Sequence, residues 1–140
     1  MLPPAPLAKM GGVEILSSRV LLHPADHQAT LAFYRDVLGL GIAREFGTDD
    51  HPGTVFFLGG GLLEISGSRP AAEPSSLMLW LQVRDVHAEL QRLAGLGVEA
   101  IREARTEPWG LVEGWIEDPD GTRIVLVQVP AEHPLRRDQR

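Results

Sequence analysis

The chain has 140 residues, 44% of them hydrophobic and 23% charged, a composition typical of one globular domain or of two small modules sharing a core. Its formal net charge of −6 disfavours nucleic acid and anionic membrane surfaces as partners. Without cysteine it has no disulfide or zinc–sulfur chemistry, and no stretch is apolar for long enough to span a bilayer. The first residues lack the features of a secretory signal, so a cytoplasmic location is expected.

The first half of the chain predicts a module with the element order βαβββ over residues 13–67. A Pro- and Gly-rich flexible arm over 1–12 precedes it, and the first strand is expected within 13–22. Asp26 is a good N-cap for an amphipathic helix over 27–38. Three strands follow this helix, over 41–46, 54–58 and 62–66.

The same pattern repeats over residues 77–129, after a linker over 68–76. Asp85 is the expected N-cap of the second helix, and a charged tail over 130–140 ends the chain. The strands are expected over 77–83, 98–105, 111–117 and 122–129.

An internal repeat determines the architecture, because neither half alone can bury both its helix stripe and its sheet face. We therefore expect an α+β fold of tandem βαβββ modules. Two four-stranded sheets would lie side by side with the helices outside, and a ligand would bind on the concave inner face.

Four short stretches of the chain resemble the vicinal-oxygen-chelate superfamily, which includes glyoxalases, extradiol dioxygenases, and fosfomycin- and bleomycin-resistance proteins. They are FYRDVLGL at 33–40, LLEI at 62–65, PWG at 108–110 and DPDGTRIVLV at 118–127. The resemblance implies a half-barrel of two modules, closed by a second chain in a homodimer. It implies no single function, since this fold hosts isomerases, lyases, dioxygenases, transferases and binding proteins.

Metal-dependent members of the superfamily place one His, Gln or Glu ligand on the first and last strand of each module. The matching positions in this sequence are Arg19, Glu64, Met78 and Val125. Arg19 has no lone pair to offer, Met78 is a soft thioether, and Val125 has no donor atom. Only Glu64 suits a divalent first-row metal. We therefore expect no metal and no other cofactor.

The inner face is expected to bind the ligand through seven residues, with no catalytic residue assigned: Arg19, Leu21, Glu64, Met78, Trp80, Trp115 and Val125. An ion pair between Arg19 and Glu64 is expected in place of the metal, because an unpaired buried charge is costly. This pair could also anchor a polar group of the ligand. Trp80 and Trp115 suggest an aromatic-lined pocket, although core packing is the alternative for either.

These features favour a metal-free binding protein of the glyoxalase/bleomycin-resistance type. It would sequester a hydrophobic or aromatic compound, an antibiotic or a metabolite, without changing it. One alternative is a metal-dependent isomerase or lyase that uses Glu64 with donors such as His23 or Gln82. Another is a structural or regulatory dimer whose cavity is filled by side chains.

Overall fold

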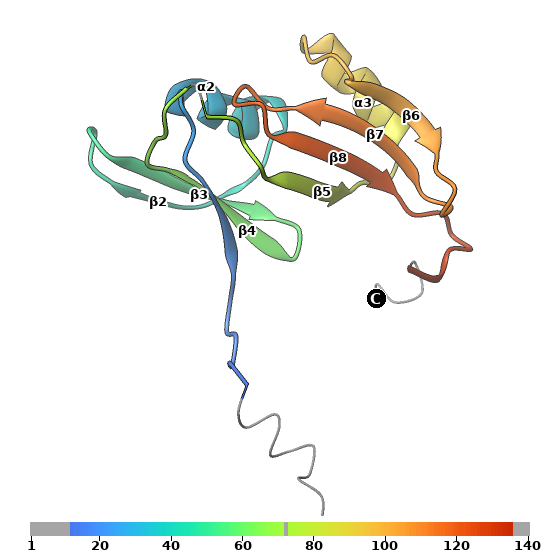
Figure 1. Cartoon of the computed structure of the whole chain (residues 1–140), viewed down its shortest axis with the longest axis horizontal. Helices are drawn as coiled ribbons and strands as arrows, with labels where there is room; N and C mark the ends of the chain where they lie inside the picture. Colours follow the sequence, from blue (N-terminus) through green and yellow to red (C-terminus); the bar gives the residue numbers. More distant parts are fainter. Residues whose placement is uncertain (1–11, 72, 136–140) are drawn as a thin grey trace, which may run out of the picture.

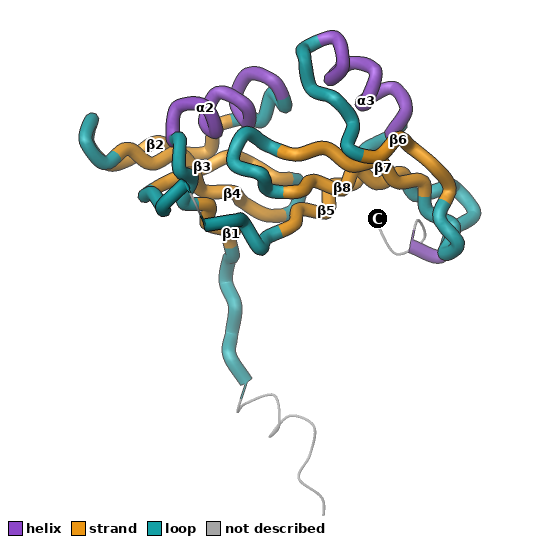
Figure 2. The backbone as a smooth tube through the Cα atoms, turned by 45° about the horizontal axis from the view of Figure 1, so that its top comes forward, coloured by secondary structure: helices purple, strands orange, loops and turns teal. Residues whose placement is uncertain are grey.

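The computed structural model describes residues 12–71 and 73–135, which form two four-stranded mixed β-sheets lying next to each other (Figure 1). Figure 2 shows the helices on one side of both sheets. Residues 12–18 extend away from the first sheet without joining either sheet (Figure 2). The predicted tandem βαβββ architecture is confirmed.

The first module forms one sheet, with the strand order β1-β4-β3-β2 and with β1 parallel to β4. Its elements are β1 (Arg19–Leu22), α2 (His27–Ala32), the π-helical turn η1 (Phe33–Val37), β2 (Ile42–Gly47), β3 (Pro52–Leu58) and β4 (Gly61–Ser66). The Asp26 carboxylate caps α2 by accepting from the Ala29 amide at 3.0 Å. The predicted single helix widens after Ala32, and the wider turn buries the adjacent rings of Phe33 and Tyr34.

The second module repeats this topology, with the strand order β5-β8-β7-β6. Its elements are β5 (Met78–Gln82), α3 (Val86–Gly95), β6 (Arg102–Thr106), β7 (Val112–Glu117) and β8 (Arg123–Gln128). Asp85 caps α3 as predicted. The second predicted strand of this module begins at Arg102 rather than at residue 98, because the Val98 amide still bonds back to the Leu93 carbonyl at the helix end.

A buried hydrogen bond joins the two modules. The Tyr34 hydroxyl on η1 donates to Asp118 Oδ2 at 2.7 Å, and Asp118 Oδ1 accepts from the Asp120 and Thr122 amides at 2.8 Å each. Burial raises the pKa of Asp118, and these three hydrogen bonds partly oppose that rise. Asp120 in turn pairs with Arg69 in the linker. The turn that contains Asp118, before β8, is therefore hydrogen-bonded to η1 of the first module.

None of the helices within the described residues is both long and apolar enough to cross a membrane.

Candidate functional site

The strand registers place the predicted site residues on the sheet faces that point away from the helices. On the first sheet, Leu21 of β1 lies opposite Glu64 of β4, while the alternating Leu22 packs in the core. On the second sheet, one row across the strands consists of Trp80, Val125, Trp115 and Arg102. The sequence had predicted Trp80, Trp115 and Val125 on this shared face, but it had not predicted Arg102 there.

The predicted ion pair between Arg19 and Glu64 is present. Arg19 Nη1 donates to Glu64 Oε1 at 2.9 Å, and the Ser66 hydroxyl donates to Glu64 Oε2 at 2.6 Å. The hydrogen bond from Ser66, followed by the bond from Arg19, holds the pKa of Glu64 below its usual range against the opposing effect of burial. Glu64 is therefore ionised, with a hydrogen bond on each oxygen and a side chain only 12% exposed. A carboxylate in this state is a poor general base.

His23, at the end of β1, is also engaged. Its Nδ1 lies 2.6 Å from the Ser66 carbonyl oxygen, and because a carbonyl can only accept, Nδ1 carries the proton. This bond fixes the tautomer, so Nε2 is the ring nitrogen that would have to serve as a metal donor.

The four positions that hold metal in metal-dependent relatives do not suit a metal in this chain. Glu64 is bound by a cation and a hydroxyl, and Met78 offers only a thioether. Val125 is 7% exposed and has no donor atom. Within residues 12–71 and 73–135, no group of three or more His, Cys, Asp or Glu side chains could hold a metal ion. No chemical step through a metal can be derived from these residues.

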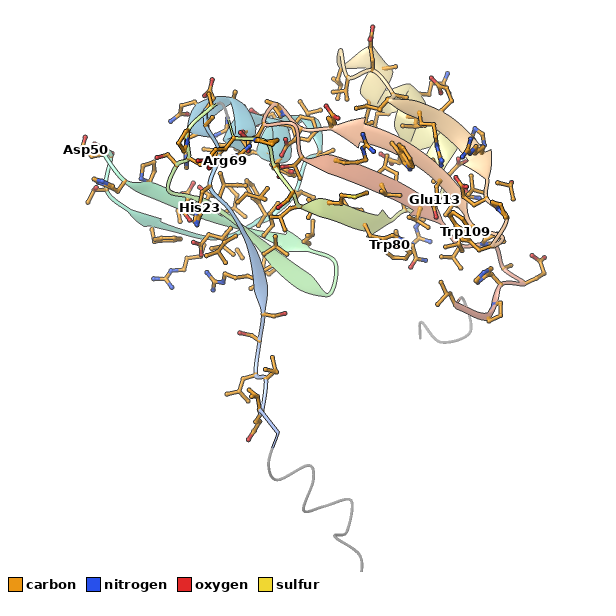
Figure 3. The ribbon with its side chains drawn as sticks, in the orientation of Figure 1. His23, Asp50, Arg69, Trp80, Trp109 and Glu113 are labelled. Carbon is orange, nitrogen blue, oxygen red and sulfur yellow. The ribbon has the colours of Figure 1, made fainter. Side chains whose placement is uncertain are left out.

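Trp80 is the open aromatic surface of the second sheet. It is 50% exposed and lies on the side of β5 away from α3 (Figure 3). It lines a groove of about 810 Å³ along the edge of β5, a volume within the usual range of small-molecule sites, about 300–1,000 Å³. The groove residues are Leu40, Leu58, Gly59, Gly60, Trp80, Leu81, Gln82, Val83 and Arg84.

Trp115 is less open than the sequence suggested. The guanidinium carbons of Arg102 and Arg123 lie 4.1 Å and 4.7 Å from its ring centre, so cations from both neighbouring strands cover the ring. Trp115 also packs against a buried cluster that includes Val125 and Val127. Direct contact of Trp115 or Val125 with a ligand stays a prediction.

Sequence reasoning missed two parts of this face. One is the Gly59-Gly60 side of the groove, which forms because the β3–β4 hairpin lies beside β5. The local sequence pattern does not predict that these two segments are neighbours. Arg123 could have been found, because it alternates with Val125 along β8 and so shares its face.

Comparison with known proteins gives a consistent family and fold. The family model described as Glyoxalase/Bleomycin resistance protein/Dioxygenase superfamily matches residues 17–126. The crystal structure of SMU.1112c is 25% identical, with a TM-score of 0.72, and the match covers 84% of this chain and 100% of that chain. No curated protein sequence is a significant match.

Two similar structures come from Streptomyces sp. CB03234. TnmS3, an antibiotic binding protein, is 22% identical with a TM-score of 0.71, covering 85% of this chain and 99% of that chain. A glyoxalase/bleomycin resistance protein is 23% identical with a TM-score of 0.65, covering 80% and 99%. At these identities the likeness shows a shared fold.

Proposed function

Because the chain belongs to the glyoxalase/bleomycin resistance protein/dioxygenase superfamily, we propose that it is a metal-free binding protein that sequesters a hydrophobic or aromatic compound. The state of Glu64 carries this proposal. It is the only suitable donor among the four metal positions, and both its oxygens are hydrogen-bonded by Arg19 and Ser66. The structural likeness to an antibiotic binding protein supports an antibiotic as one class of ligand.

The groove beside Trp80 is the place where we propose that an aromatic ligand binds. A planar ring can stack on the exposed indole, and Leu58 and Leu81 provide further apolar surface. The Gln82 amide and the Arg84 guanidinium offer polar contacts that could orient the ligand. Few polar groups in a mostly apolar lining are typical of small-molecule sites.

A fluorescence titration against a panel of planar aromatic antibiotics tests this function. We expect quenching of the tryptophan signal, and a recovered ligand of unchanged mass by mass spectrometry, because the Glu64 carboxylate is already held by Arg19 and Ser66. Conversion of a ligand that depends on Glu64 would instead support the metal-dependent isomerase or lyase. Unaltered fluorescence across the panel would favour a dimer whose cavity is filled by side chains.

We also propose that the protein is a homodimer in solution. The inner faces expose large apolar side chains, among them Leu21, Phe57, Met78 and Trp80, and β1 and β5 are unpaired sheet edges within the described residues. Exposed apolar side chains and open sheet edges of this kind favour association with a second chain.

Light scattering at micromolar concentration is expected to give about twice the chain mass of 15.3 kDa, because a two-fold pair would cover these faces. A stable particle of 15.3 kDa would contradict the dimer.

A further inference from the structure

The guanidinium of Arg123, on the inner face of β8, lacks a hydrogen-bond acceptor in the part of the chain that the structure describes. Its Nε is buried without a partner, and its Nη2 lies 3.8 Å from Glu117 Oε1, too far for a hydrogen bond. The group is nevertheless held in place by stacking on Trp115, and its side chain is 35% exposed. Arg123 is therefore an oriented cation with free donors.

Two neighbouring side chains of the same stack each contain one buried donor atom without an acceptor. Trp115 Nε1 and Arg102 Nε are buried without hydrogen-bond partners, as is Arg123 Nε. Only five buried side-chain atoms in the described residues lack a partner, and these three come from one stack on adjacent strands. Buried donors in proteins are almost always satisfied. Three such donors in one stack point to an acceptor that residues 12–71 and 73–135 do not supply.

Of Arg19, Arg102 and Arg123, only Arg123 has no hydrogen-bonded guanidinium nitrogen. Arg102 Nη2 already donates to Glu107 and to the Glu113 carbonyl oxygen, and Arg19 is bonded to Glu64. Trp80 pairs with Val125, two residues after Arg123, and lies on the same face. Strand spacing puts the Cα atoms of Trp80 and Arg123 about 8 Å apart, a separation that a bicyclic aromatic acid can span.

We propose that Arg123 binds an oxyanion of the ligand, and that the ligand is a planar aromatic compound bearing a carboxylate or a similar group. This inference rests on the proposed binding function and specifies its ligand class. The aromatic body stacks on Trp80, and the oxyanion takes the place of the loose Glu117 contact on Arg123. A guanidinium suits this role because its planar fork can bind a carboxylate through two parallel hydrogen bonds.

Isothermal titration calorimetry with 2-naphthoate and its uncharged analogue 2-naphthamide tests the proposal, because the two probes share one ring system. We expect 2-naphthoate to bind about tenfold more tightly than the amide, as a charge-assisted pair would give. Arg123→Met should abolish this preference while changing amide affinity by less than about twofold. Arg123→Lys, which keeps the charge but loses the fork, should retain part of it.

Two further variants separate local from general effects. Arg35→Met makes the same change in net charge on the exposed side of the helical segment, where Arg35 pairs with Asp36, and should leave the preference intact. Glu117→Gln removes the competing carboxylate and should raise 2-naphthoate affinity. Circular dichroism checks that each variant folds, and if Arg123→Met does not, the lysine and Glu117 variants decide.

Equal affinity of the wild type for the two probes would overturn the inference and leave the proposed function standing. Retention of the preference in Arg123→Lys and Arg123→Met would also overturn it. Failure of both probes to bind at about 1 mM, an affinity scarcely above non-specific association, would overturn the inference together with the aromatic-binding function.

Discussion

Replacing Trp80 with alanine is expected to weaken the binding of a planar aromatic ligand by about 2 kcal/mol, or roughly thirtyfold in affinity. Trp80 is 50% exposed and forms the aromatic wall of the groove along β5. Stacking on such a ring contributes on the order of 0.5–1.5 kcal/mol beyond the area that it buries. Calorimetry is the appropriate measurement, since the substitution removes one of the three fluorescent indoles.

Trp109→Ala is the matched control for this variant. Trp109 is also exposed, at 57%, but it lies in a loop and its indole donates to Glu113 Oε2 at 2.8 Å (Figure 3). Its removal should change affinity by less than about threefold, because it is outside the groove. Equal losses in the two variants, or wild-type affinity in Trp80→Ala, would remove Trp80 from the site.

Tyr34→Phe is expected to lower the free energy of unfolding by about 1–3 kcal/mol at neutral pH, because it leaves a buried carboxylate oxygen without its donor. Tyr34 is fully buried, and Asp118 Oδ2 accepts from its hydroxyl at 2.7 Å. Burial, and then the nearby Asp118 charge, raise the pKa of Tyr34, so the hydroxyl stays protonated as a donor. Urea denaturation of the two proteins measures the loss.

The cost of Tyr34→Phe should depend on pH, and the direction follows from Asp118. Burial raises the pKa of Asp118 in the folded protein above its value in the unfolded chain. Protonated Asp118 therefore contributes to the free energy of unfolding at low pH, and this contribution is lost as pH rises through the folded pKa. The Tyr34 hydroxyl stabilises the charged form, and therefore its removal costs most above that pKa. The difference in unfolding free energy between the two proteins should therefore narrow as pH falls from neutrality through the folded pKa of Asp118.

Asp118→Asn provides the control for this pH effect, because it removes the titrating group at the same position. In that background the cost of Tyr34→Phe should no longer vary with pH. A cost that is constant with pH in the presence of Asp118 would show that its charge is not involved.

Much of the fold could be predicted because its signals are local and occur twice. Asp26 and Asp85 mark the two helix starts in corresponding places, and strand alternation assigns each inward residue without tertiary information. The Arg19–Glu64 pair followed from alternation together with the cost of an unpaired buried charge. These inferences needed only the positions of side chains along their own strands.

The rest of the site depends on how segments far apart in the sequence pack against each other, and the sequence pattern does not give that packing. The groove exists because the β3–β4 hairpin stands beside the edge of β5. The cover over Trp115 comes from arginines on two different neighbouring strands, Arg102 and Arg123. The sequence could place the indole on the inner face, but it could not show which side chains lie on it.

Elemental analysis of the protein, after incubation with zinc, nickel, manganese and ferrous salts and then desalting, tests most directly whether binding is metal-free. The account predicts less than about 0.1 metal ion per chain, because Glu64 is already bonded to Arg19 and Ser66 and the other ligand positions lack suitable donors. Close to one ion per chain that is lost in Glu64→Ala would contradict it.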